Sequence, residues 1–207
     1  MDSKVLHNLS YGLFVVTANQ DGKDNGCITN TALQIASDPL TISVAINKAN
    51  LTCEMIQATK KMTISILSED ATFDIFKHFG YQSGRDVDKF ADYKDCRRTV
   101  NGTMAITKGT NAYISVYVTA EVDLGSHILF IGMPTDGEVI SSVPSATYDY
   151  YFKNIKPKPE AVGKTLDGKT VWVCKICGYE YVGEELPEDF ICPICKHPAA
   201  DFEKVIK

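Results

Sequence analysis

The sequence predicts a mainly β protein, in which an antiparallel barrel with a few short helices is followed by a small metal-binding domain. Two observations carry this prediction. Apolar and polar residues alternate with period two in several segments, and four cysteines near the end of the chain form two Cys-x-x-Cys pairs. With 207 residues and 44% hydrophobic content, the chain is long enough for one medium-sized domain and this tail.

Six segments have the pattern of β-strands. From Ala112 to Asp123, apolar residues alternate with tyrosines and polar residues, as in a half-buried strand. The five other segments are Tyr11–Ala18, Cys27–Ile35, Leu40–Ile46, Met62–Leu67 and Ile128–Met133. The dipeptides Asp21-Gly22 and Asp136-Gly137 are typical of turns. Because helical patterns are few, these strands predict an antiparallel barrel.

Two short helices are predicted between the strands. Asn50 is in a position to cap a helix that runs through Thr59. A second helix is expected from Thr72 to Phe79, where Gly80 would end it.

A linker is predicted after the barrel. Residues 156–168 begin with the sequence Lys-Pro-Lys-Pro and have little apolar content, which is typical of a semi-extended connection. We therefore expect two domains, residues 1–155 and residues 169–207, joined by this segment.

The four cysteines of the tail, Cys174, Cys177, Cys192 and Cys195, predict a tetrahedral metal site. Two residues between cysteines let a tight turn direct both sulfur atoms at one ion, and the second pair completes the coordination. So short a tail buries little apolar surface, so we expect metal binding to supply its folding energy. Four thiolates suit either zinc or a single iron, and the ligands alone do not distinguish them.

Charge and composition exclude several classes of protein. The net charge is −5, and there is no basic stripe, which disfavours nucleic-acid binding. No apolar run is long enough for a membrane span, and no secretory signal is evident, so we expect a cytoplasmic protein. The three other cysteines are scattered singly, which argues against a disulfide framework. Acidic residues between the cysteine pairs form either a solvated loop or a docking face for a basic redox partner.

The tail resembles rubredoxin, the one-iron electron carrier. The resemblance lies in Cys-x-x-Cys-Gly-Tyr at Cys174 and in Cys-Pro-x-Cys at Cys192, which is followed by Pro198 and Phe202. The loop between the two pairs is shorter than in free-standing rubredoxins and is similar to the rubredoxin-like tail of rubrerythrins. This resemblance implies iron, with a zinc ribbon as the alternative.

The first domain resembles the flavin reductase-like FMN-binding split barrels. The resemblance rests on the order of several phrases, which are Tyr11-Gly12-Leu13-Phe14-Val15-Val16-Thr17, Asn30-Thr31-Ala32-Leu33-Gln34-Ile35, Asn47-Lys48-x-Asn50-x-Thr52, Phe79-Gly80 and Ser126-His127-Ile128-Leu129-Phe130-Ile131-Gly132. A split barrel followed by a rubredoxin-like tail resembles the proteins called high molecular weight rubredoxins. The family implies a homodimer with the flavin at the subunit interface.

The resemblance also implies the FMN-binding residues. Those near the ring are Ile28, Thr29, Asn30 and Thr31, and those near the phosphate are Asn47, Lys48, Asn50 and Thr52. Hydroxyl, amide and ammonium groups of this kind suit a flavin phosphate, but asparagine and threonine also serve as turn and cap residues. Further candidates are Tyr81, Ser83 and Arg85, which could instead form a solvated loop, and Tyr148, which could instead pack against other aromatic rings.

His127 is the candidate catalytic residue, because flavin reductases carry a histidine near the nicotinamide at this position. Its role would be to orient the nicotinamide by a hydrogen bond, and the alternative is a structural histidine. Cys27 also lies in the ring-side segment. We expect it to be a small buried core residue, and the alternative is that its thiol contacts the ring.

The combined resemblance implies an electron-transfer enzyme. NAD(P)H would donate a hydride to FMN, and FMN would pass single electrons to the iron and on to a soluble acceptor, which the family context identifies as a flavodiiron protein that reduces dioxygen or nitric oxide. The chain has no dinucleotide-binding glycine motif, so the nicotinamide would bind transiently. The alternatives are a flavin or ferric reductase with a structural zinc ribbon, and a non-enzymatic flavin and metal redox sensor.

Overall fold

The computed structural model describes residues 5, 8–157, 170–175, 179–192 and 198–206. The chain divides into two compact units, Met1–Lys156 and Pro157–Lys207, which are described separately. Most of the described secondary structure is β, which confirms the predicted class. None of the described helices is long and apolar enough to cross a membrane.

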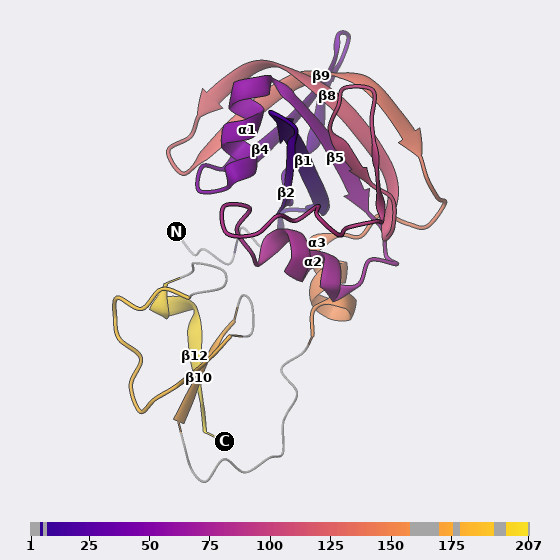
Figure 1. Ribbon diagram of the computed structural model, residues 1–207. Coiled ribbons are helices and arrows are strands. Elements are labelled where there is room, and N and C mark those ends of the chain that lie inside the picture. The colour runs from indigo at the N-terminus through magenta and orange to yellow at the C-terminus, as the bar shows by residue number, and fades with distance from the viewer. Residues whose placement is uncertain (1–4, 6–7, 158–169, 176–178, 193–197, 207) are drawn as a thin grey trace. The chain divides into compact units, whose positions relative to one another are not determined.

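The first unit is built on an antiparallel seven-stranded sheet that curls into a barrel (Figure 1). The strand order is β2-β1-β5-β8-β9-β4-β3. The strands are β1 (Phe14–Gln20), β2 (Lys23–Thr29), β3 (Leu33–Ser37), β4 (Leu40–Asn47), β5 (Lys61–Leu67), β8 (Thr110–Asp123) and β9 (His127–Val139). Fully buried valines, isoleucines and phenylalanines fill the interior, as period-two alternation on one buried face requires.

The expected strand Cys27–Ile35 is wrong as a single element. It is two strands, β2 and β3, which lie at opposite edges of the sheet. β2 pairs with β1 and β3 pairs with β4, so the chain leaves one edge at Thr29 and joins the other at Leu33. Strand-like residues continue through the crossing, so alternation alone gave no sign of the break.

The two predicted turns have different outcomes. Asp21 and Gly22 have φ angles of 53° and 82° and form the turn between β1 and β2. Asp136-Gly137, by contrast, lies inside β9, paired with Ser115 and Ile114 of β8. A Cβ at position 137 would lie 2.9 Å from the carbonyl oxygen of Tyr113, so this glycine permits a close approach of two strands.

The two predicted helices are present as α1 (Leu51–Thr59) and α2 (Phe73–Gly80). Asn50 occupies the N-cap position of α1, but its side chain makes no capping hydrogen bond, so the expected cap is wrong in its chemistry. α2 ends at Gly80, as expected, and Tyr81 is its C-cap residue. Each helix buries one face: α1 packs in one hydrophobic cluster with Val16, and α2 packs in a second with Leu13.

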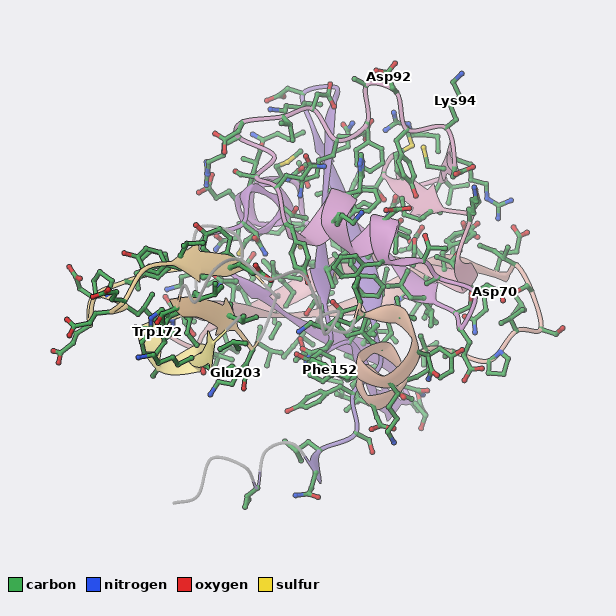
Figure 2. All side chains as sticks on the ribbon, turned by 90° about the horizontal axis from the view of Figure 1, so that it is seen from below. Asp70, Asp92, Lys94, Phe152, Trp172 and Glu203 are labelled. Carbon is green, nitrogen blue, oxygen red and sulfur yellow. The ribbon has the colours of Figure 1, made fainter. Side chains whose placement is uncertain are left out.

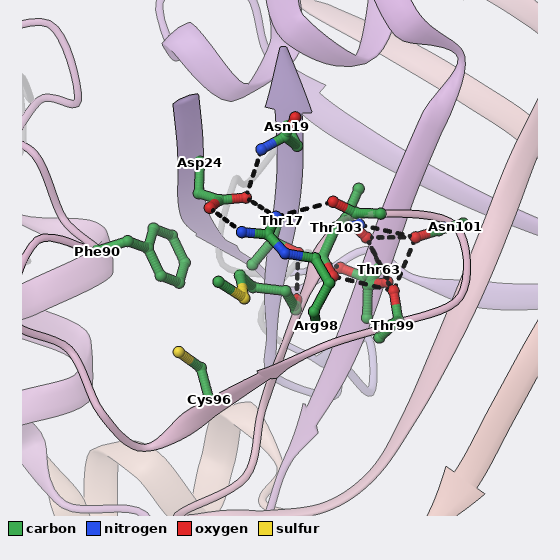
Figure 3. Close-up of polar contacts among 12 residues, drawn as sticks. Thr17, Asn19, Asp24, Thr63, Phe90, Cys96, Arg98, Thr99, Asn101 and Thr103 are labelled. Atoms are coloured by element: carbon green, nitrogen blue, oxygen red, sulfur yellow. Dashed lines mark hydrogen bonds and ion pairs between the residues drawn. The ribbon is translucent and has the colours of Figure 1, made fainter. Parts of the chain in front are cut away.

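A short hairpin, β6 (Cys96–Arg98) with β7 (Met104–Ile106), was not predicted. A buried network of hydroxyl groups joins it to the barrel (Figure 3). The Thr63 hydroxyl of β5 lies 2.6 Å from the hydroxyl of Thr103 and 3.0 Å from that of Ser115. Arg98 of β6 also donates two hydrogen bonds to the carboxylate of Asp24, at 2.6 and 2.8 Å (Figure 3).

The first unit ends in α3 (Tyr148–Tyr150) and the π-helix η2 (Tyr151–Ile155), which carries Phe152 (Figure 2). The Tyr151 ring lies 4.4 Å from the ring of Phe76, so this segment packs on α2. Most of the predicted linker, residues 158–168, lies outside the described residues.

The second unit contains a three-stranded antiparallel sheet in the order β11-β10-β12. Its elements are β10 (Thr170–Cys174), β11 (Glu180–Val182), the 3-10 helix η3 (Ala199–Asp201) and β12 (Phe202–Ile206). Trp172 and Glu203 lie on neighbouring strands of this sheet (Figure 2). Cys174, Cys192 and Phe202 form its buried centre.

Candidate flavin site and metal centre

The ring-side segment begins at the end of β2, where Ile28 and Thr29 are half-buried. The hydroxyls of Thr29 and Thr31 both donate to the carbonyl oxygen of Ala45 in β4, at 3.0 Å each. These hydroxyls therefore hold the crossing segment against β4. What remains for a ligand is the main chain and the side-chain amide of Asn30.

The phosphate-side segment lies where β4 leads into α1. The Asn47 side-chain oxygen accepts a hydrogen bond from the amide of Ala49 at 2.9 Å, and so shapes the turn. The Lys48 ammonium pairs with the Asp123 carboxylate at 2.6 Å, and this bond lowers the Asp123 pKa. Lys48 is thus engaged by a carboxylate, and its charge also acts on the Cys53 thiol, next to Thr52.

Cys27 connects the two segments. Burial raises the pKa of its thiol to about 11, while hydrogen bonds with the Thr52 and Asn50 side chains act in the opposite direction. The Thr52 hydroxyl also accepts a hydrogen bond from the Asn25 amide at 3.0 Å. Residues of β2 and of the start of α1, predicted separately, therefore form one cluster.

Two residues of this cluster were missed by the sequence analysis. Asn25 is 2% exposed, and its side-chain oxygen is buried with no hydrogen-bond partner among the described residues. Lys89 is 4% exposed, and its ammonium donates to the carbonyl oxygens of Gly26 and Phe79, at 2.8 and 2.9 Å. Both residues lie in polar stretches, where a sequence pattern does not separate buried from exposed side chains.

The loop after α2 closes over this cluster. The Ser83 hydroxyl accepts a hydrogen bond from the amide of Arg85 at 3.1 Å, and Arg85 pairs with Glu54 of α1. A Cβ at Gly84 would lie 2.1 Å from the Asn25 side-chain oxygen, so only glycine fits there without displacing Asn25. Ser83 therefore lies in a loop that is held against the predicted site.

Tyr81 and Tyr148 belong to a different cluster, at the end of the first unit. The Tyr81 hydroxyl lies 3.1 Å from that of Tyr151, and the Tyr148 ring packs edge to face on Tyr11 and Phe152. Burial raises the Tyr148 pKa. Tyr148 and Ile28 pack on the same hydrophobic core, which links this cluster to the ring-side residues.

His127 lies opposite Asn47 in the pairing of β4 with β9. Its Nδ1 is 2.8 Å from the Ser126 hydroxyl, and the Ser126 carbonyl accepts a hydrogen bond from the amide of Lys48 at 3.1 Å. The predicted catalytic histidine is thus held beside the turn that leads into α1.

These residues fit a flavin. The start of α1 has no side-chain cap, so its N-terminal amides suit an anionic group such as a phosphate. The Asn25 side chain, covered by Gly84, holds the Thr52 hydroxyl at this helix start.

The tail places one cysteine of each pair in a single cluster. Cys174 and Cys192 are 1% and 0% exposed, and both pack with Phe202. Half-buried side chains enclose them, and these are Trp172, Tyr179, Tyr181, Leu186 and Phe190. The other two predicted ligands, Cys177 and Cys195, lie outside the described residues. Two soft thiols that meet in a largely apolar shell fit a thiolate metal centre.

Comparison with known proteins decides the family. Residues 6–158 match the model of the flavin reductase like domain. The chain belongs to the flavin reductase-like family. This flavin reductase-like protein also matches the rubrerythrin, rubredoxin-like domain over residues 172–203, which confirms the two resemblances found in the sequence.

Two relatives extend the comparison of this flavin reductase-like protein. It is 36% identical to the high molecular weight rubredoxin of Moorella thermoacetica, over 99% of this chain and all of the relative. It is 32% identical to a ferric-chelate reductase (NAD(P)H) of Archaeoglobus fulgidus, over 82% of this chain and all of the relative.

Solved structures agree on the fold. The NADH:FAD oxidoreductase SgcE6 of Streptomyces globisporus has a TM-score of 0.61 at 18% identity, over 69% of this chain and 84% of that chain. The FMN-binding protein of Thermus thermophilus has a TM-score of 0.59 at 20% identity, over 65% of this chain and 73% of that chain. With its rubredoxin-like tail, this flavin reductase-like protein is an electron-transferring oxidoreductase, and its two domains imply flavin and iron.

Proposed function

We propose that the protein transfers electrons from NAD(P)H through FMN to one iron held by Cys174, Cys177, Cys192 and Cys195, and on to a soluble acceptor. The observation that carries this proposal is the similarity to a high molecular weight rubredoxin along 99% of the chain, because it includes both domains. A nicotinamide gives up two electrons as a hydride and a four-thiolate iron accepts one. A flavin supplies the chemistry that converts between them.

The residues of the first unit have distinct roles in this proposal. Asn50, Thr52 and the start of α1 would hold the phosphate, because the helix end is uncapped and Thr52 is buried beside it. The Ile28–Thr31 segment would hold the ring edge through main-chain groups, since its two threonine hydroxyls bond to Ala45. His127 would orient the nicotinamide from the β9 side of the same turn.

A flavodiiron protein is the proposed acceptor. The segment of the tail that follows β11 has four exposed carboxylates, which are Glu184, Glu185, Glu188 and Asp189. Such a cluster would speed the encounter with an acceptor that has a basic docking face.

A homodimer is also proposed. Edge strand β3 is exposed along its whole length, and Leu33, Ile35 and the neighbouring Leu40 are 66%, 49% and 47% exposed. Apolar side chains on an unpaired sheet edge favour burial against a second copy of the chain. The mass in solution, measured by light scattering, would equal that of one chain if this proposal were wrong.

A second candidate is a ferric reductase with a structural zinc ribbon. The similarity to a ferric-chelate reductase over 82% of the chain favours it. In that case, the electrons would leave from the flavin and the tail would have only a structural role.

One experiment separates the two candidates. Protein purified without oxygen should contain about one iron per chain, and NADH should bleach bound FMN much faster than it bleaches free FMN. Cys177→Ser should abolish transfer to an external acceptor and leave flavin reduction intact, whereas Cys96→Ser, outside the tail, should change neither. Zinc in place of iron, or undiminished transfer by Cys177→Ser, would favour the ferric reductase.

A further inference from the structure

Lys89 is a buried cation that no carboxylate neutralises within the described part of the chain. Its ammonium is bonded to the carbonyl oxygens of Gly26 and Phe79. The nearest acid in the sequence, Asp88, uses its carboxylate to accept a hydrogen bond from the amide of Phe90 at 2.9 Å. Carbonyl dipoles hold the ammonium in place, but they do not cancel its charge.

Such a charge is costly to bury unless it interacts with an anion. Burial lowers the pKa of Lys89, and the neighbouring Cys27 acts in the opposite direction. Cys27 supplies no lasting negative charge, because burial raises its own pKa to about 11. The charge of Lys89 is therefore available to a ligand.

The position of Lys89 indicates which ligand group it serves. Its two carbonyl partners are Gly26, two residues before Ile28 of the ring-side segment, and Phe79, near the C-terminal end of α2. The uncapped start of α1 provides a separate place for the phosphate. Lys89 also interacts with Cys27, which lies against Asn50 and Thr52, so it adjoins both segments of the candidate site. With the phosphate at the start of α1, the flavin ring is the group left for Lys89.

Building on the proposed function, we propose that Lys89 is the counter-charge for the reduced flavin ring. A hydride brings two electrons and one proton from NAD(P)H, which leaves as NAD(P)⁺. The ring that accepts it therefore becomes an anion unless it takes a second proton from the solvent. A buried ammonium near the ring stabilises that anion relative to the neutral oxidised ring, and so makes the flavin easier to reduce.

The test compares the midpoint potential of FMN bound to the wild-type protein and to Lys89→Met. The variant should bind reduced FMN about tenfold more weakly relative to oxidised FMN, a fall of about 30 mV for a two-electron couple. Lys89→Arg keeps the charge and should retain most of the potential. Lys23→Met is the matched control, because Lys23 also donates to a carbonyl, that of Gly84, at 3.2 Å, and should leave the potential unchanged.

Other outcomes would overturn the proposal. Equal weakening of oxidised and reduced FMN by Lys89→Met would give Lys89 only a structural role. Weaker binding of FMN with unchanged binding of riboflavin would make the phosphate its partner. If Lys89→Met does not fold, Lys89→Gln removes the charge, keeps a donor and gives the same readout.

A wild-type protein that binds no flavin would refute the proposed function itself, whereas normal binding with an unchanged potential in the variants would refute only this inference.

Discussion

Cys27 shows how burial sets the chemistry of a single side chain. The thiol is 4% exposed, and its pKa is raised from 9.0 to about 11, chiefly by burial. In the unfolded chain the thiol ionises near its ordinary pKa. Between about pH 9 and pH 11 the unfolded state therefore loses a proton that the folded state keeps, and the folded state loses stability as the pH rises.

The free energy of unfolding of the wild type should accordingly fall relative to that of Cys27→Ala as the pH rises. The variant is less stable at pH 8 because it loses packed atoms, and the difference should narrow by on the order of 1 kcal/mol by pH 10. Urea denaturation followed by circular dichroism measures both proteins. A difference that stays constant from pH 8 to pH 10 would show that the thiol ionises equally in both states.

At the scale of residues, the sequence identified the candidate site only where resemblance supplied a position. Asn50 and Thr52 contact Cys27, and Thr29 and Thr31 bond to Ala45, so each group is tied to the barrel by its own contacts. Lys89 could not be found in this way, because a lysine between acidic residues has the pattern of a solvated loop. Only the fold shows that its ammonium turns inward, to two main-chain carbonyls.

At the scale of elements, the segment that joins β6 to β7 is held to the barrel by buried hydroxyl groups, in addition to the apolar packing of β7. Thr63 is its central partner, with a hydroxyl near those of Thr99, Thr103 and Ser115. All four side chains are buried. Removing one hydroxyl therefore leaves the others with fewer partners in a place that water does not reach.

Thr63→Val should destabilise the protein by about 1 to 3 kcal/mol, because the shape is kept and the hydroxyl is lost. Hydrogen exchange should be faster for the β6 and β7 amides than for those of β8 and β9. Thr119→Val on β8 is the control, since the Thr119 hydroxyl is exposed and should contribute less than about 0.5 kcal/mol. Equal effects of the two substitutions would contradict a special role for the buried network.

The elements that the sequence predicted well are those with one buried face. α1, α2, β4, β5 and β8 follow the pattern of their apolar residues. The hairpin escaped prediction because each of its strands has only three residues, which is too short for a periodic pattern to be recognised. The β2–β3 crossing escaped prediction because strand-like residues run through it, and only the pairing with β1 and β4 marks the break.

At the scale of the whole molecule, the two units have different sources of stability. The first has large buried clusters around α1 and α2. The described core of the second consists of Cys174, Cys192 and Phe202 with a few half-buried rings. So small a core stabilises a fold weakly, and metal binding would supply the remainder.

Removing the metal should therefore unfold the tail alone. The chain has one tryptophan, Trp172, which packs on the tail core, so its fluorescence reports on this unit. After chelation or Cys192→Ser, the emission should shift to longer wavelength as the indole becomes exposed to water. The circular dichroism of the barrel should stay nearly unchanged. An unshifted emission would mean that the tail folds without metal, and Cys96→Ser provides the control.

The turn between β8 and β9 also fixes how the candidate site is assembled. It spans Leu124–Ser126, and Gly125 adopts a φ of 84° within it. Directly after it, His127 pairs with Asn47. Inserting or deleting one residue here would move β9 by one position against its neighbours and turn the imidazole to the opposite side of the sheet. If His127 has the proposed role, the length of a solvent-exposed loop would determine that role as much as the histidine itself.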